Sequence, residues 1–194
     1  MFKNINFLIT KGNTLVIKGQ SGTGKSTLLS LILGINIPTS GEILINDFST
    51  SSCTINFDNI LGYIGPEPYF INGTIKENLL YGLSKDRQIT EMELWNALEL
   101  MELKSLVMNL PNQLEESIFD IPQFSTGQKQ RLSFSRAIIR RPSILILDEA
   151  TANLDTATEN KIIENLTPLF KNCTSVIVTH KNAFDKIATH EITL

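Results

Sequence analysis

The stretch GQSGTGKST, residues 19–27, decides the fold of this chain. It fits the pattern G-x-x-x-x-G-K-S/T, follows the apolar run TLVIK and precedes a leucine-rich segment. The defining positions are Gly19, Gly24, Lys25 and Ser26. Glycines let backbone N–H groups turn toward phosphate oxygens, because no Cβ stands in the way. A strand, a glycine loop and a helix in this order predict a phosphate-binding loop.

We expect every residue of this loop to contribute to nucleotide binding. Its members are Gly19, Gln20, Ser21, Gly22, Thr23, Gly24, Lys25, Ser26 and Thr27. Lys25 can reach the β- and γ-phosphates, and the hydroxyl of Ser26 can bind Mg²⁺. The N-terminus of the following helix adds a field that favours anions. The alternative is a purely structural glycine turn, but chance matches to this pattern are rare at background residue frequencies.

Two carboxylates end a second buried strand. The run SILILDE covers residues 143–149 and closes with Asp148 and Glu149. Acidic residues at the carboxyl end of a strand lie where α/β sheets bind their ligands. We therefore expect Asp148 to hold Mg²⁺, through water, and Glu149 to orient or deprotonate an attacking water. Taken alone, an Asp-Glu pair is more often a helix-cap feature.

One histidine also ends an apolar run. His180 closes SVIVTH, residues 175–180, and a single histidine in this position is usually a structural residue. The neighbouring strands, however, end in Gly19 and Asp148, so we expect His180 to face the γ-phosphate. His190 has no such neighbours and is expected on the surface.

Composition excludes several classes of protein. The chain has 194 residues and 42% hydrophobic content, which suits one globular domain, perhaps with a small appended lobe. Its net charge of −3 gives no case for nucleic acid binding. Cys53 and Cys173 cannot form a disulfide framework, which fits a reducing compartment. No apolar run approaches the roughly 20 residues that span a bilayer, so the chain is expected in, or facing, the cytosol.

Apolar runs and helical periodicity predict the remaining elements. Strands are expected at residues 6–10, 14–19, 41–46 and 60–65, and helices at residues 25–33 and 156–170. Gly-Asn at 12–13 predicts a turn, and so a hairpin between the first two strands.

A helical lobe interrupts this α/β core. Between residues 73 and 141 the sequence shows helical periodicity, and Leu94 and Leu98 share one face. We expect a core of residues 1–72 and 142–194 with a helical subdomain inserted at residues 73–141.

A second anion site is expected inside this lobe. The stretch FSTGQKQRLSFSRA, residues 124–137, begins a basic amphipathic segment. Its opening turn contains Ser125, Thr126, Gly127 and Gln128. Free backbone N–H groups at a helix start attract anions, and Lys129 and Arg131 lie close by in sequence.

In order and spacing, these segments resemble the nucleotide-binding domain of ABC ATPases over nearly the whole chain. GQSGTGKST resembles its Walker A motif, FSTGQKQR the signature usually written LSGGQ, and ILILDE its Walker B motif with the catalytic glutamate. ANLD at 152–155 resembles the D-loop, and Thr179-His180 the switch histidine. The resemblance implies an α/β fold: a P-loop NTPase (RecA-like) core with an antiparallel β portion and an inserted helical subdomain.

The resemblance also implies how two copies work together. In this family, two nucleotide-binding domains, identical or not, pack head to tail around two ATP molecules. Ser125 and the backbone of Gly127 would contact the γ-phosphate held by the Walker A loop of the other domain, with Thr126 and Gln128 beside them. Asp155 would help to join the two sites, and ATP hydrolysis would loosen the dimer.

The stretch GYIGPEPYFINGTIKENLLYG, residues 62–82, is similar to the exporter branch of the family. That similarity implies Mg²⁺-dependent ATP hydrolysis coupled to export through a transmembrane partner, fused or separate, at the cytoplasmic face of a membrane. Two alternatives stay open: a soluble ABC ATPase acting on nucleic acid or ribosomes, and a nucleotide sensor with little turnover.

The chain departs from the family pattern in several places. Pro66 stands where the family has the Q-loop glutamine, Thr126 replaces the first signature glycine, and Phe124 replaces the leucine. Proline offers no amide side chain to Mg²⁺ or water. The only N-terminal aromatic residues, Phe2 and Phe7, lie close to the phosphate loop in sequence. We therefore expect weak ATP binding with little base preference.

Overall fold

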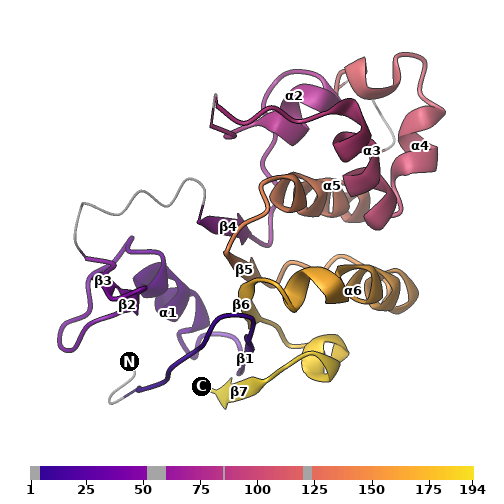
Figure 1. Ribbon diagram of the computed structural model, residues 1–194. Helices are drawn as coiled ribbons and strands as arrows, with labels where there is room; N and C mark the ends of the chain where they lie inside the picture. The colour runs from indigo at the N-terminus through magenta and orange to yellow at the C-terminus, as the bar shows by residue number, and fades with distance from the viewer. Residues whose placement is uncertain (1–4, 52–59, 85, 120–123) are drawn as a thin grey trace.

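The computed structural model describes residues 5–51, 60–84, 86–119 and 124–194. Its centre is a five-stranded sheet in the order β4-β5-β6-β1-β7, with all neighbouring strands parallel (Figure 1). The strands are β1 (Thr14–Lys18), β4 (Leu61–Ile64), β5 (Ile144–Asp148), β6 (Thr174–Val178) and β7 (His190–Thr193). A separate antiparallel pair consists of β2 (Leu44–Ile45) and β3 (Phe48–Ser49). The expected mixed α/β fold is confirmed.

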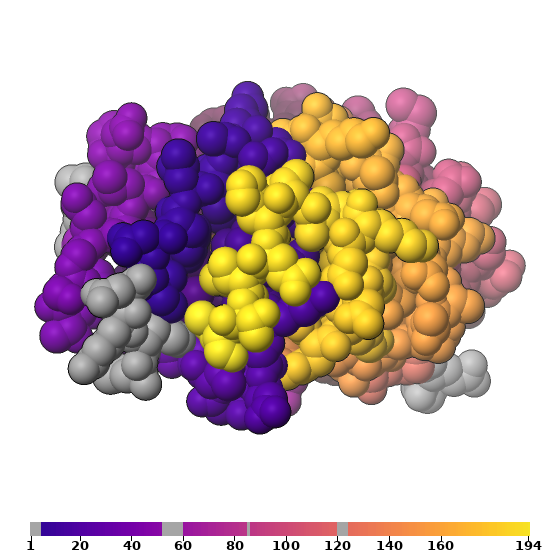
Figure 2. All heavy atoms as spheres, turned by 90° about the horizontal axis from the view of Figure 1, so that it is seen from below, coloured from indigo at the N-terminus to yellow at the C-terminus, as the bar shows by residue number. Residues whose placement is uncertain are grey.

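The prediction of a hairpin near the N-terminus is wrong. Strand β1 pairs with β6 on one edge, where Thr14 is opposite Ser175, and with β7 on the other, where Leu15 is opposite His190. A strand has only two edges, so residues 6–10 have no edge of β1 to pair with, and they form no strand. Figure 2 shows the C-terminal segment, in yellow, lying against the N-terminal part of the chain, in indigo.

Helices cover both faces of the sheet. Helix α1 (Lys25–Ile32) packs on one face with Ile146 of β5 and Val178 of β6. Helix α6 (Thr156–Phe170) packs on the other face with Leu147 and Ile177. Side chains alternate along a strand, so Asp148, two residues after Ile146, belongs to the face that α1 covers.

The remaining α-helices lie at one end of the sheet, in the upper part of Figure 1. They are α2 (Ile75–Leu80), α3 (Glu91–Leu100), α4 (Lys104–Met108) and α5 (Thr126–Ile139), with a short 3₁₀ turn η1 (Gln113–Glu115). Another 3₁₀ turn, η2 (Ala183–Lys186), follows β6. Leu98 of α3 and Leu132 of α5 belong to the same apolar cluster as Ile64 and Leu147 of the sheet. The helical segment and the sheet therefore share one core.

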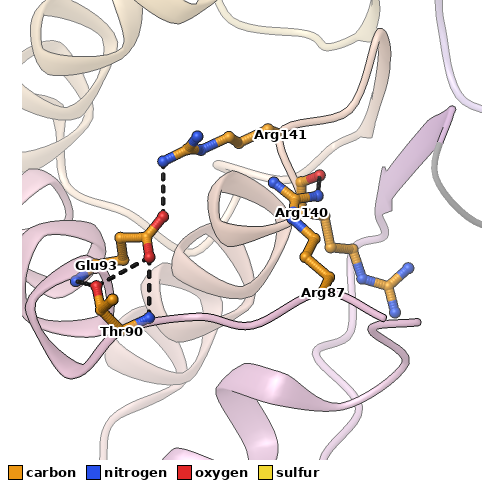
Figure 3. A network of polar contacts seen from close by, with 5 residues as sticks. All are labelled: Arg87, Thr90, Glu93, Arg140 and Arg141. Atoms are coloured by element: carbon orange, nitrogen blue, oxygen red, sulfur yellow. Dashed lines mark hydrogen bonds and ion pairs between the residues drawn. The ribbon is translucent and has the colours of Figure 1, made fainter. Parts of the chain in front are cut away.

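A polar network ties the loop before α3 to the segment that connects α5 with β5 (Figure 3). The carboxylate of Glu93 accepts hydrogen bonds of 2.9 Å from the backbone and from the hydroxyl of Thr90. Its other oxygen lies 2.7 Å from the guanidinium of Arg141. Arg87 donates to the carbonyl oxygen of Arg140. These contacts join the start of α3 to the segment that leads from α5 into β5, the strand that carries Asp148.

Several expected elements match closely and others are shorter. Helix α6 begins and ends at the expected residues 156 and 170. The strand expected at residues 41–46 is reduced to the two residues of β2. Within the described ranges, no helix has both the length and the apolar content that crossing a bilayer requires. Cys173 is a buried free thiol, and Cys53 lies outside the described residues.

Candidate nucleotide site

The phosphate loop connects β1 to α1 and needs glycine for two reasons. Gly19 has a φ of 153°, and a Cβ there would lie 2.6 Å from the carbonyl oxygen of Leu194 and 2.8 Å from Oγ1 of Thr23. Gly24 caps α1 in the left-handed conformation, with a φ of 103°. Side chains at these two positions would strain the backbone or fill the loop. The loop therefore has the open, concave backbone that a phosphate group requires.

Lys25 places a positive charge inside this loop. The residue is only 6% exposed, and its Nζ donates to the carbonyl oxygens of Gly19 at 2.9 Å and Gln20 at 2.8 Å. The following residues, Ser26 and Thr27, are exposed in the first turn of α1. The ammonium group can thus reach an anion seated in the loop, and the helix start adds to the favourable field.

The loop and the predicted histidine line the same hollow. A hollow of about 520 Å³ is lined by Lys18, Gly19, Gln20, Thr23, His180, Thr193 and Leu194. His180 thus lies beside Gly19, Gln20 and Thr23 of the loop, and its contact with the γ-phosphate stays a prediction. Ser21 and Gly22 are exposed at the tip of the loop. Phe7 is 40% exposed, and Phe2 lies outside the described residues.

Glu149 and His180 form a direct pair. Oε1 of Glu149 lies 2.8 Å from Nε2 of His180. Glu149 has a φ of 48°, uncommon for a residue with a side chain, and its N–H donates to the carbonyl oxygen of Val178 at 2.9 Å. The backbone therefore turns sharply off β5 and directs the carboxylate toward the end of β6. Such strain is typical of functional positions.

Asp148 is a carboxylate with too little positive charge around it. It is 9% exposed, and burial, together with the charge of Glu149, raises the pKa of Asp148. The Tyr63 hydroxyl, 3.4 Å from Oδ2, and the charge of Lys25 act in the opposite direction. A cation would relieve this imbalance, so the site fits Mg²⁺. Among the described residues no cluster of three or more metal-binding side chains occurs, so phosphate and water oxygens would complete the coordination, as is usual for Mg²⁺.

The segment 125–128 begins α5 with a capping box. Oγ of Ser125 accepts from the N–H of Gln128 at 3.2 Å, and Oε1 of Gln128 accepts from the N–H of Ser125 at 2.8 Å. The two side chains therefore satisfy the helix start, and two of the free N–H groups expected there, those of Ser125 and Gln128, are occupied.

A second hollow, of about 310 Å³, lies between the starts of α5 and α6. It is lined by Ser125, Thr126, Gly127, Arg131, Asn153, Leu154, Asp155 and Thr158. Asp155 caps α6, because its Oδ1 accepts from the N–H of Thr158 at 3.0 Å, and this contact lowers the pKa of Asp155. Among the predicted residues, the first hollow is lined by Gly19, Gln20, Thr23 and His180, and the second by Ser125, Thr126, Gly127 and Asp155. Neither hollow is lined by Lys25, Ser26, Asp148, Glu149 or Gln128, and Glu149 is connected to the first one through its pair with His180.

Three contacts near these hollows were not expected. Tyr63 reaches Asp148, as described above. Gln130 is fully buried on α5, and its Nε2 donates to the carbonyl oxygen of Gly65 at 2.9 Å, directly before the exposed Pro66. Lys181 contacts the turn after β5. The only sequence signal for Lys181 is its position next to His180.

The comparisons with known proteins agree with this geometry. Residues 2–152 match the sequence profile of the family described as ABC transporter. That match covers more than half of the chain, so the chain belongs to the ABC transporter family, whose members are ATPases that bind ATP.

The similar proteins that were found are much longer than this chain. It is 40% identical over 186 residues to the ATP-dependent permease MDL1 of Candida albicans, covering 93% of the chain and 27% of that protein. It is 36% identical over 183 residues to a multidrug resistance ABC transporter ATP-binding and permease protein of Lactococcus lactis subsp. lactis, covering 93% and 31%. The structure of a bacterial Atm1-family ABC exporter with ATP bound superposes with a TM-score of 0.81 at 26% identity, covering 94% and 32%. The chain therefore spans about a third or less of these relatives.

Proposed function

We propose that this chain hydrolyses ATP with the help of Mg²⁺ and so powers export through a transmembrane domain. The observation that carries the proposal is the pair of Glu149 and His180 at 2.8 Å, with His180 lining the same hollow as Gly19, Gln20 and Thr23 of the phosphate loop. A loop that binds phosphate needs no such pair for binding alone. A carboxylate held by a histidine next to bound phosphate is suited to activating water.

In the proposed mechanism, the backbone N–H groups of the phosphate loop and the ammonium of Lys25 bind the phosphates. Ser26 and Asp148 would hold Mg²⁺, which neutralises charge on the β- and γ-phosphates when bound. Glu149 orients a water and accepts its proton as the oxygen attacks the γ-phosphate, and His180 keeps Glu149 in place. The products are ADP and phosphate, and catalysis rests on positioning and charge neutralisation.

The second hollow gives the proposal its dimeric form. It presents Ser125, Gly127 and the neighbouring Thr126 at the start of a helix, without a phosphate loop of its own. We propose that a second nucleotide-binding domain packs head to tail against this face, so that the signature contacts the γ-phosphate of the other copy. Asp155, in the same hollow, would lie where the two sites meet.

The export step rests on the relatives. Two of them are named as permeases, and the superposed structure is named as an exporter. We propose that residues 73–141 act as a helical subdomain on a core of residues 1–72 and 142–194, and that the chain works at the cytoplasmic face of a membrane. The described surface gives no support to a role on nucleic acid, since the whole chain is slightly acidic.

One observation favours a second candidate function. Pro66 is exposed at the end of β4, where it offers no side-chain amide to a nucleotide. A chain that binds ATP but turns it over slowly would act as a nucleotide sensor. Release of phosphate from millimolar MgATP separates the two functions.

The replacement of Glu149 by glutamine tests the proposed function. Glu149→Gln should lose roughly 90% or more of phosphate release, as expected for the loss of a general base. It should also accumulate an ATP-bound dimer, seen by light scattering in MgATP as a doubled mass. Glu164→Gln, an exposed change on α6, is the matched control and should behave as the wild type. Unchanged turnover in Glu149→Gln contradicts the proposed hydrolysis, and a monomer at saturating MgATP contradicts the proposed dimer.

A further inference from the structure

The side chain of Lys181 places its charge in the turn after β5. Its Nζ donates to the carbonyl oxygens of Thr151 at 2.7 Å and of Leu154 at 2.9 Å. Its side chain is 33% exposed, so the charge is partly screened from water. These are short hydrogen bonds from a charged donor, which are about twice as strong as neutral ones.

A buried acid on α6 completes this contact. Oε2 of Glu159 lies 3.4 Å from Nζ of Lys181, and the Glu159 side chain is only 3% exposed. Its other oxygen, Oε1, is buried and has no hydrogen-bond partner among the described residues. A carboxylate in this setting depends on a nearby cation, because an unpaired buried charge is costly. Glu159 therefore keeps the Lys181 ammonium beneath the turn.

The turn that Lys181 holds connects the two hollows. It begins at Glu149, which pairs with His180, and ends at Asp155, the cap of α6. Two of its own hydrogen bonds close it: Ala152 N–H to the carbonyl oxygen of Glu149 at 3.0 Å, and Leu154 N–H to that of Thr151 at 3.1 Å. Leu154 also lines the second hollow.

The far side of the turn touches the signature helix. A Cβ placed on Gly127 would lie 3.1 Å from the carbonyl oxygen of Asn153 and 3.4 Å from Cδ2 of Leu154. The position of residues 153 and 154 therefore sets the shape of the hollow that Ser125 and Gly127 line. A shift of the turn moves a wall of this hollow.

We propose that Lys181 is a positioning residue that locks this turn, so that the switch histidine of one site and the signature wall of the other move as one unit. The consecutive residues His180 and Lys181 both contact this turn. His180 pairs with Glu149 at its start, and Lys181 donates to the carbonyl oxygens of Thr151 and Leu154 further along. The inference rests on the proposed function in that the second hollow receives a nucleotide from another copy.

Hydrogen exchange on the nucleotide-free chain tests the lock without any turnover. Lys181→Met keeps most of the aliphatic stem and removes the donors, so the amides of Ala152 and Leu154 should exchange about tenfold faster, as expected for the loss of charged hydrogen bonds. Lys186→Met is the control, since Lys186 is exposed on η2 and makes no ion pair among the described residues. Equal exchange in Lys181→Met and wild type overturns the proposal.

Dimer formation tests the connection to the second hollow. In the Glu149→Gln background, Lys181→Met should raise the MgATP concentration at half-maximal dimer about tenfold, while the affinity of the monomer for a fluorescent ATP analogue stays unchanged. A role confined to overall stability would not give this split. Lys181→Arg should bring the MgATP concentration at half-maximal dimer most of the way back to its original value, because a guanidinium can donate to both carbonyl oxygens.

The outcomes separate this inference from the proposed function. An unchanged dimer midpoint in Lys181→Met, with faster exchange in the turn, overturns the proposed connection. Failure of Glu149→Gln itself to dimerise counts against the proposed function. In that case the exchange of the Ala152 and Leu154 amides decides whether Lys181 locks the turn.

Discussion

The carboxylate of Glu149 and the imidazole of His180 join the ends of two adjacent parallel strands, with 2.8 Å between Oε1 and Nε2. The register brings them together, because Asp148 is opposite Val178 and the next residues leave the sheet at the same edge. Both side chains keep part of their surface open to solvent, so a water can approach the pair.

The first prediction concerns His180. His180→Ala removes the partner of Glu149, so kcat should fall about 10- to 100-fold while the affinity for ATP changes less than about threefold. Initial rates of phosphate release measured against MgATP concentration separate the two quantities. His190→Ala is the matched control, because His190 is exposed on β7. An equal loss in both variants would assign the effect to something other than the pair.

The second prediction concerns Asp148 in the nucleotide-free chain. Burial and the charge of Glu149 raise the pKa of Asp148, so the native state holds this proton more tightly than the unfolded chain does. Stability therefore falls as pH rises above the ordinary aspartate range, and the ionised carboxylate is unfavourable at neutral pH. Asp148→Asn should raise the Tm by about 1–3 °C at pH 7 and lose this advantage in acid.

Calorimetry without nucleotide or Mg²⁺ measures this shift. Asp86→Asn serves as the control, because Asp86 is exposed and should give the same Tm as the wild type. A lower Tm for Asp148→Asn at pH 7 would mean that the carboxylate stabilises the free chain.

The third prediction concerns the end of α1. Gly34 has a φ of 69°, and a Cβ there would lie 2.7 Å from the carbonyl oxygen of Thr50. Gly41 has a φ of 78° but open space around it. Gly41→Ala should cost about 1 kcal/mol for its backbone alone, and Gly34→Ala about 2–3 kcal/mol, because the steric clash is added. Denaturant midpoints of the two variants give the difference, and equal midpoints would remove the clash as a cause.

The fourth prediction concerns pH and the network of Figure 3. Hydrogen bonds from the backbone and the hydroxyl of Thr90, and then the charge of Arg141, lower the pKa of Glu93. A carboxylate with a lowered pKa in the folded state stabilises above its unfolded pKa, and this contribution is lost as pH falls through the folded pKa. Glu93→Gln should therefore lower the Tm at about pH 7 and less so at about pH 3.5. A difference in Tm between the variant and the wild type that is constant across this pH range would assign the effect to the shape of the side chain alone.

The elements that the sequence predicts correctly are those with strong local signals. Strands β5 and β6 are covered by other elements on both faces, so they are near-continuous apolar runs. Helix α6 starts directly after Asp155, whose side chain caps it, and its bounds match the expected range. The phosphate loop is specified by glycine, because three of its positions, Gly19, Gly22 and Gly24, have backbone conformations that other residues rarely adopt.

The elements that the sequence could not predict depend on partners that are distant along the chain. Residues 6–10 look like a strand, but the edge of β1 that they would need is taken by β7, which starts at His190 near the other end of the chain. Strand β7 itself is short and largely exposed, so its sequence HEIT gives little signal. Pairing between the two ends of a chain leaves no trace in local composition.

The sequence proposes the residue types of the candidate site but gives few of their contacts. The serine and glutamine of the signature, Ser125 and Gln128, have the three-residue spacing of a capping box, which would have shown that their side chains serve the helix start. The contacts of Tyr63 and Lys181 are different, because each crosses from one element to another. Only the folded structure brings those atoms together.

The alternation along β5 has a consequence for how this chain can vary in length. Asp148 belongs to the α1 face only because it lies an even number of positions, four, after Ile144, and Glu149 turns off the strand at the next position. An insertion or deletion of one residue within 144–148 would exchange the two faces and point the acid into the apolar layer beneath α6. Insertions and deletions in related chains should accordingly be found in the exposed stretch at 35–42, where no strand alternation has to be kept. They should be absent from residues 144–148.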